Sequence, residues 1–238
     1  MRVVGRIVHA VPVTSFLFDR FNLFNMKPKF LLSAVCSLIA LSMTASAQNL
    51  SELVAQLDSD QMNQRTEARN GIQQQLTDST APTADANARS ALEEEALQIL
   101  QSDPSHPAQV WLLRMLELTG SENSVSVIAS YLNSSDGQLR DCARRALVAN
   151  PAPEATTVLA RAMMRASDAE KRPYIDGFVF RGDRRAAKVI VPLLKSKDAD
   201  TVIQAANALV VLNEPSVYSE LKVAHTNAPQ GSRAAIEL

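Results

Sequence analysis

Apolar residues recur along this chain at a fixed step of 31 residues. One column of them consists of Leu97, Ile128, Leu159, Ile190 and Leu221. Three further columns have the same step: Leu116, Leu147, Phe178 and Leu209; Val127, Val158 and Val189; and Leu132, Met163 and Leu194. A fixed period of this size is typical of stacked supersecondary units, each of which buries its apolar face against its neighbours.

Within each period the apolar spacing is helical. Residues 127–132 place apolar side chains at i, i+1, i+4 and i+5, and residues 139–147 form a partner face that contains two alanines. Proline, glycine and helix-capping residues separate these faces. The sequence therefore predicts an all-α fold, an α-α superhelix or solenoid of antiparallel helix pairs. The predicted pairs are 108–119 with 122–133, 137–149 with 152–165, 169–180 with 184–196, and 199–212 with 215–226.

Two segments resemble a known repeat. Asp136-Gly-Gln-Leu-Arg-Asp-Cys-Ala-Arg-Arg-Ala-Leu147 looks like the first helix of a HEAT repeat, in which a turn aspartate precedes an arginine and an Ala-x-x-Ala-Leu face. Asp198-Ala-Asp-Thr-Val-Ile-Gln-Ala-Ala-Asn-Ala-Leu209 is a second example. Residues 105–227 as a whole resemble the array of exported bacterial HEAT-repeat domain proteins. The resemblance implies a HEAT/armadillo-like solenoid whose extended surface binds proteins.

The chain before the array divides into further predicted helices. Apolar spacing favours a short helix at 50–57, a second at 60–76 and a third at 88–101, with a polar, flexible connection at 77–87. We interpret residues 48–104 as atypical helices that cap the amino end of the solenoid, and residues 105–238 as HEAT-like repeats.

A processing signal precedes these helices. Residues 26–47 contain two lysines, an apolar run and Ala45-Ser-Ala47 before Gln48, which is the pattern of a secretory signal peptide. We therefore expect cleavage near Ala47–Gln48, a periplasmic or secreted protein, and no stable membrane anchor after cleavage. Residues 1–25 fit no part of such a signal and are predicted to be a mis-assigned upstream extension, with Met26 as the true start.

Charge and cysteine content limit the function further. Residues 48–238 contain 19 Lys and Arg against 24 Asp and Glu, a net charge of −5. This balance argues against a dedicated nucleic-acid binder. Cys142 is the single cysteine of this segment, so no intrachain disulfide is expected, and its place on a helix favours a buried thiol.

No familiar catalytic pattern occurs in the sequence. His106 and His225 are far apart, and metal-binding, nucleophile-elbow and phosphate-loop motifs are absent. Residues 93–95 are three consecutive glutamates, which we interpret as a solvated helix face. The tripeptide 181–183 is interpreted as an interhelical turn. These observations predict a chain that is not an enzyme and has no catalytic residue, metal site or cofactor.

Basic residues offer the best candidates for a binding surface. Arginines just after turns are interpreted as structural, bonding turn carboxylates or helix ends. On the second helices the possible partner-binding residues are Arg161, Arg165, Lys188 and Lys195. Arg161 shares its repeat column with Ser130 and Pro192, so these residues form no continuous basic stripe.

The favoured function is a non-catalytic protein–protein interaction or scaffold module in the cell envelope, which binds a protein partner along the solenoid surface. One alternative is the amino-terminal repeat region of a larger exported protein whose activity lies elsewhere, since no polar capping helix is evident near Leu238. Another is a bilin-lyase-like HEAT enzyme or maturation factor, which would need a groove with both acidic and basic side chains.

Overall fold

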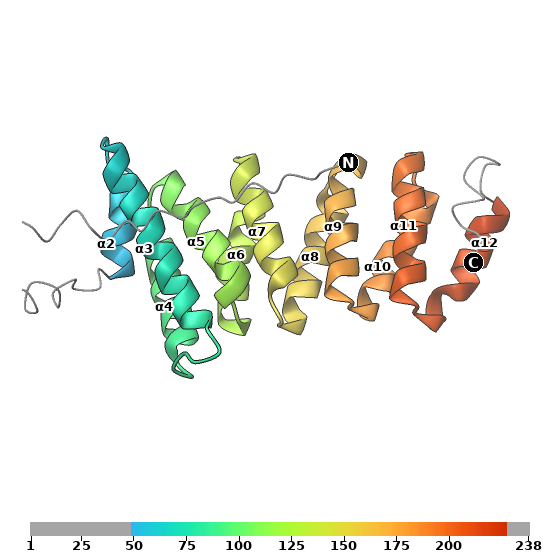
Figure 1. Cartoon of the computed structure of the whole chain (residues 1–238). Helices are drawn as coiled ribbons and strands as arrows, with labels where there is room; N and C mark the ends of the chain where they lie inside the picture. Colours follow the sequence, from blue (N-terminus) through green and yellow to red (C-terminus); the bar gives the residue numbers. More distant parts are fainter. Residues whose placement is uncertain (1–48, 228–238) are drawn as a thin grey trace, which may run out of the picture. The chain divides into compact units, whose positions relative to one another are not determined.

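The computed structural model describes residues 49–227 (Figure 1). The predicted extension 1–25, the predicted signal peptide 26–47 and the end of the chain at 228–238 lie outside the described residues.

The described part of the chain is helical and contains no strand, which confirms the predicted all-α fold. The helices before the array are α2 (Leu50–Gln56), α3 (Met62–Thr80) and α4 (Ala88–Gln101). The array consists of α5 (His106–Thr119), η2 (Glu122–Ser124), α6 (Val125–Tyr131), α7 (Gly137–Ala149), α8 (Pro153–Arg165), α9 (Asp168–Arg181), η3 (Arg184–Ala186), α10 (Ala187–Ile190), η4 (Val191–Lys195), α11 (Ala199–Leu212), η5 (Pro215–Val217) and α12 (Tyr218–Asn227).

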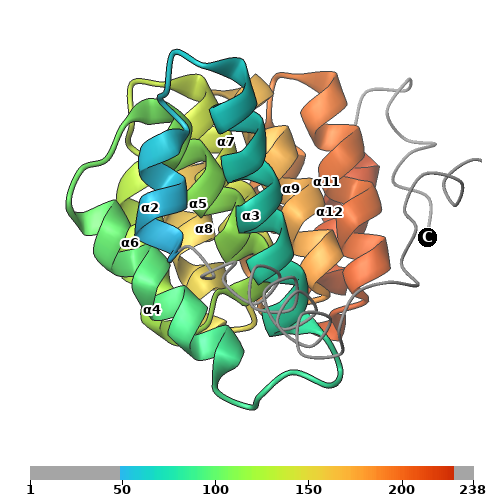
Figure 2. The ribbon, with the colours of Figure 1, turned by 60° about the vertical axis from the view of Figure 1, so that its left-hand side comes forward.

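The helices stack in chain order as a solenoid of helix pairs. The first helix of each pair packs on the next first helix, α5 on α7, α7 on α9 and α9 on α11. The second members also touch, α6 with α8 and η4 with α12. Both views show α7, α9 and α11 side by side (Figure 1, Figure 2).

The repeating apolar columns form the core between these helices. Ile128, Leu159 and Ile190 are buried on the second members, and Leu147 and Phe178 are buried on the first. Alanines at the helix contacts are buried as well, which allows close approach of neighbouring helices. The 31-residue period is therefore the step from one helix pair to the next.

The cap residues of the first helices follow the same step. Each of these side chains makes a capping hydrogen bond at the start of its helix. Ser105 accepts from the backbone N–H of Ala108, Asp136 from Leu139 and Asp198 from Thr201, while Ser167 forms a capping box with Glu170. Such a cap stabilises a helix by about 1 kcal/mol, so every pair starts at a fixed point in the repeat.

The second members are less regular than predicted. The segment predicted as one helix at 184–196 is divided into η3, the four-residue α10 and η4. Pro192 lies in this segment, has no N–H to donate and clashes with the preceding turn, so it interrupts α-helical hydrogen bonding. The helix α3 also differs, because it continues to Thr80 rather than ending at 76. The hydroxyls of Thr77 and Thr80 donate to carbonyls one turn back, which shortens the connection to residues 81–87.

A polar joint connects the pairs in the middle of the array. Asn150 is 1% exposed, and its amide donates to the carbonyl of Ser121 at 2.7 Å and to Ser124 Oγ at 3.2 Å. The Arg181 guanidinium donates to the carbonyls that end α7 and precede α8. Its acceptors are the carbonyl oxygens of Leu147 at 2.8 Å, Val148 at 3.1 Å, Asn150, and Ala152 at 2.9 Å. Residues 181–183 are thus an interhelical turn, as predicted, with Gly182 at a left-handed φ of 62°.

Replacing this arginine should weaken the whole array. We expect Arg181→Met to lower the free energy of unfolding by about 2–4 kcal/mol, because several partly buried carbonyls lose their donor. Urea denaturation followed by circular dichroism measures the change. The control is Arg184→Met, since the Arg184 side chain is exposed and makes no hydrogen bond to a described residue. Equal stability of the two variants would contradict a structural role for Arg181.

Candidate functional site

The four predicted partner-binding residues lie on the second members of two adjacent pairs. Arg161 and Arg165 are on α8, Lys188 is on α10 and Lys195 ends η4. All four are exposed, and none makes a hydrogen bond or ion pair with another described residue. The charge of Lys188 also acts on Glu214, where it is a minor cause of the lowered pKa of that carboxyl after the hydrogen bonds from Ser216. All four cations remain open to a ligand because no carboxylate forms an ion pair with them.

Two of them border one hollow, which we call the lysine hollow. It lies between α8, the start of α9, α10 and η4, and has a volume of about 400 Å³. Its lining consists of Met163, Met164, Asp168, Lys171, Lys188, Val189, Pro192, Leu193, Lys195 and Ser196. Met164 is 65% exposed, so an apolar surface open to solvent lies next to the lysine ammonium groups.

One side of the lysine hollow is fixed by hydrogen bonds. Lys171 Nζ lies 2.8 Å from Asp168 Oδ1, and Ser196 Oγ donates to Asp168 Oδ2 at 2.8 Å. These donors, Lys171 foremost, hold the pKa of the Asp168 carboxyl below its usual range. Asp168 therefore neutralises Lys171, and the unpaired positive charge of the hollow comes from Lys188 and Lys195.

Arg165 borders a different hollow, which we call the arginine hollow. It lies between the end of α6, α7, the end of α8 and α9, and has a volume of about 270 Å³. Its lining consists of Leu132, Asn133, Arg140, Asp141, Arg144, Ala162, Arg165, Ala166, Glu170, Pro173 and Tyr174. Arg161 lines neither hollow.

The side chains of the arginine hollow differ in how firmly they are held. Arg140 Nη1 donates to the carbonyls of Ser134 and Ser135, each at 2.9 Å. Arg144 is paired with Asp141 and also donates to the carbonyl of Pro173 at 3.2 Å. Burial raises the pKa of the half-buried Tyr174 hydroxyl, so this group stays protonated and can donate near neutral pH.

The arginine hollow is a groove with acidic and basic side chains, which the sequence alone did not reveal. Its charged groups come from three different helices that only the stacking brings together. Arg140 and Glu170 are separated by nearly one repeat step, and that spacing was the one available signal.

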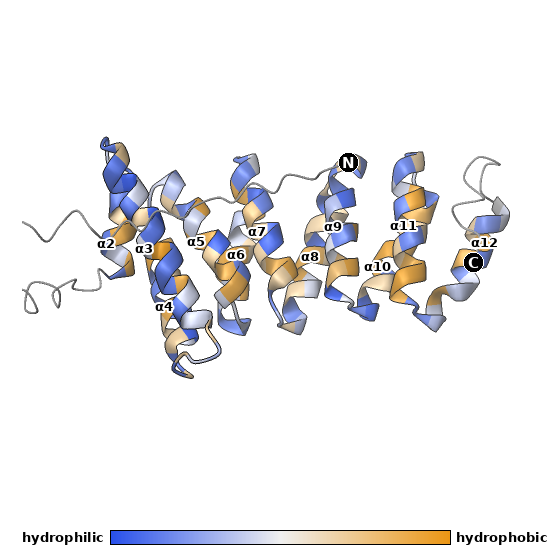
Figure 3. Cartoon of the chain, in the orientation of Figure 1, coloured by the Kyte–Doolittle hydropathy of each residue, from blue (hydrophilic) through white to orange (hydrophobic). Residues whose placement is uncertain are grey.

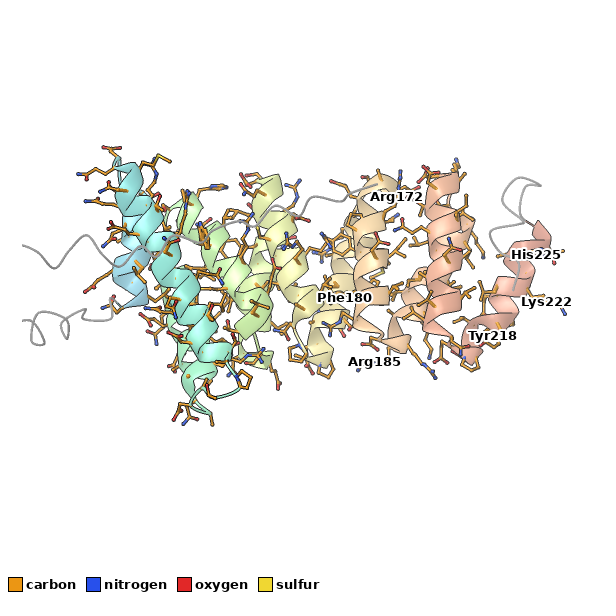
Figure 4. The ribbon with its side chains drawn as sticks, viewed as in Figure 1. Arg172, Phe180, Arg185, Tyr218, Lys222 and His225 are labelled. Carbon is orange, nitrogen blue, oxygen red and sulfur yellow. The ribbon has the colours of Figure 1, made fainter. Side chains whose placement is uncertain are left out.

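Other arginines are structural, as predicted. Arg145 pairs with Glu117 at 2.8 Å and so ties α7 to α5. Arg185 pairs with Asp183 at 2.7 Å, at the lower edge of the array in Figure 4. The hydrogen bond from Arg185, helped by one from Thr156, lowers the pKa of Asp183 to about 2.

The interpretation of residues 93–95 as a solvated face is wrong for its first member. Glu93 is 2% exposed and accepts a hydrogen bond from the backbone N–H of Ser121 at 2.6 Å. Successive residues of a helix point in different directions, so one of three consecutive glutamates turns inward. Glu93 meets the start of η2 and links α4 to the first complete pair of the array.

The histidine and the thiol occupy unremarkable positions. His106 Nε2 lies 3.3 Å from Asp136 Oδ2, and both side chains are exposed. Cys142 is free and buried, and burial raises the pKa of its thiol, which agrees with the predicted buried thiol. Among residues 49–227 no cluster of three or more potential metal ligands occurs. Within the same residues no helix has the length and apolarity needed to cross a membrane.

Comparison with known proteins gives structural neighbours only. No protein-family model matches the chain, and no curated protein sequence matches it. The complex of CpcE and CpcF of phycocyanin lyase from Nostoc sp. PCC7120 matches over 79% of this chain and 74% of that chain, with 18% identity and a TM-score of 0.46. Two engineered proteins match over 79% of this chain, one with 18% identity, 94% coverage and a TM-score of 0.42. The other has 16% identity, 95% coverage and a TM-score of 0.40.

The prediction that the chain is not an enzyme is corrected by these findings. A phycocyanin lyase complex is among the solved structures that match. The absence of a familiar catalytic motif does not exclude an enzymatic role. The helical-repeat part of the sequence resemblance agrees with the observed solenoid.

Proposed function

We propose that this chain is a repeat module that binds an acidic segment of a partner protein across α8, α10 and η4. The observation that carries the proposal is the lysine hollow, where exposed apolar side chains lie beside cations that have no partner among the described residues. Arg161 extends the same face along α8.

Charge and apolar surface together favour such a ligand. Residues 48–238 carry a net charge of −5, so an acidic segment is attracted where exposed cations are grouped, as they are on α8, α10 and η4. Met164 and Pro192 offer apolar contact within the lining of the same hollow. An apolar centre with a charged rim is the usual anatomy of a protein interface.

Charge reversal at this face tests the proposal. The protein is used to capture partners from the envelope fraction, and binding of the recovered partner is then measured by calorimetry at several salt concentrations. We expect Arg161→Glu with Lys195→Glu to weaken binding about tenfold or more, and salt to weaken the wild-type complex. Arg69→Glu is the control, because Arg69 is exposed on the distant α3. Equal losses in the two variants would contradict binding at this face.

A second candidate function is the bilin-lyase-like maturation role, and the arginine hollow favours it. Three arginines, two carboxylates and a protonated tyrosine line one depression, which supplies the acidic and basic groups that this role needs. Arg165 is the member of this set without a partner and would bind an anionic group of the ligand. Binding of a carboxylated chromophore, followed by absorbance, should be lost in Arg165→Glu and retained in Lys195→Glu. The reverse pattern would count against this candidate.

Export through the predicted signal peptide would place either function in the cell envelope. The sequence pattern at residues 26–47 supports this proposal. Amino-terminal sequencing of the protein from expressing cells should give Gln48 as the first residue. Recovery of peptides from residues 1–25 would contradict the proposed start at Met26.

A further inference from the structure

A row of exposed side chains runs along the opposite set of helices, close to their carboxyl ends. Its members are Leu118 on α5, Ala149 on α7, Phe180 on α9 and Val211 on α11, again at the 31-residue step. Leu118 is 55% exposed, Phe180 78% and Val211 64%, and Ala149 is also exposed. Figure 4 shows Phe180 on the lower part of α9, and Figure 3 shows apolar residues in the lower parts of α9 and α11. Large apolar side chains aligned on a surface mark an interaction site.

A polar row lies one helical turn before the apolar row. Its members are Arg114, Arg145, Asp176 and Asn207, all exposed. Residues i and i+4 share a helix face, so each polar residue is next to the apolar residue of its own helix. We call these two rows together the first-helix face. Its amino-terminal half is basic, whereas its carboxyl-terminal half is acidic and neutral.

The first-helix face is complementary to itself. A two-fold axis parallel to the helices, between α7 and α9, places a second copy face to face with the first and reverses the order of its pairs. Ala149 then lies opposite Phe180 of the second copy, so the small residue makes room for the large one. Leu118 lies opposite Val211 in the same arrangement. A two-fold contact of this kind is isologous, since each residue pair occurs twice.

The charges select the same arrangement. Arg145 lies opposite Asp176 of the second copy, and Arg114 lies opposite Asn207. Arg145 is 49% exposed on its side chain and uses one nitrogen, Nη2, for Glu117, so further guanidinium donors are free to meet a carboxylate. A two-fold arrangement that keeps the pairs in the same order places α9 opposite α9 of the second copy, so Phe180 no longer meets Ala149.

We propose that two copies of this chain pair through the first-helix face, with Phe180 of each packed on Ala149 of the other. The interface lies on the first helices, whereas the cations used in the proposed function lie on the second members. Pairing therefore leaves the lysine hollow open in both copies, and the inference does not depend on the identity of the partner protein.

Exchange of the two central residues tests the pairing. Sedimentation velocity is run on the protein purified from cells expressing the full chain, over about 1–100 µM, where moderate affinities are resolved. We expect the wild type to reach the mass of two copies and Phe180→Ala to raise the dissociation constant about tenfold or more. The double variant Phe180→Ala with Ala149→Phe should restore pairing, because each contact again joins one Phe with one Ala. Met62→Ala, an exposed apolar change on α3, should leave the mass unchanged.

The charged row supplies an independent arm. Asp176→Arg opposes two arginines and should weaken pairing, while Asp176→Glu should keep it; circular dichroism verifies that each variant is folded. A wild type that stays a single copy over the whole concentration range overturns the proposal. A dimer that is indifferent to Phe180→Ala, or a double variant that stays monomeric, overturns the assigned face. A complex only with an unrelated protein on this face overturns the second copy as its occupant.

Discussion

Each helix pair of this array can bury its apolar faces only against the pairs on either side. A pair that started one residue early would turn its buried column toward solvent, so burial demands a constant step along the chain. The capping residues Ser105, Asp136, Ser167 and Asp198 meet that demand by starting every first helix at the same point of the repeat. The buried apolar columns and the capping residues therefore both require the same 31-residue period.

The polar joints explain why a net acidic chain keeps so many arginines. At the carboxyl end of α7 and in the turn that follows, backbone carbonyls have no donor within their own helix. A buried carbonyl without a donor is destabilising. Arg181 satisfies several of them at once, because its planar guanidinium carries five donors. Once these structural arginines are set aside, Arg161, Arg165, Lys188 and Lys195 remain as a group of exposed cations on α8, α10 and η4.

The sequence predicted the fold more fully than the site, for a physical reason. Helix bounds such as 137–149 follow from local spacing and local caps, which one stretch of chain contains entirely. Pro192 in the sequence is itself a signal for an interrupted helix. The strong apolar pattern on either side of it nevertheless favoured one continuous helix at 184–196. The inward turn of Glu93 and the grouping of Arg140, Arg165 and Glu170 depend on which helices stack together. Such contacts between distant segments leave little trace in a single sequence.

In a repeat array the exposed positions recur at the same step as the buried ones, so both kinds form columns. The two kinds of column differ in what they can contribute to binding. In core columns every repeat needs a similar apolar side chain, so the residues of these columns are determined by the stacking of the helices alone. In exposed columns nothing in the stacking demands similarity, and a change of character from repeat to repeat sets one place on the surface apart from another. The column Arg114, Arg145, Asp176 and Asn207 changes from basic to acidic to neutral within one aligned row. Because the charge changes along the row, the two ends of the face differ. A second copy whose pairs run in the reverse order then places acidic residues opposite basic ones.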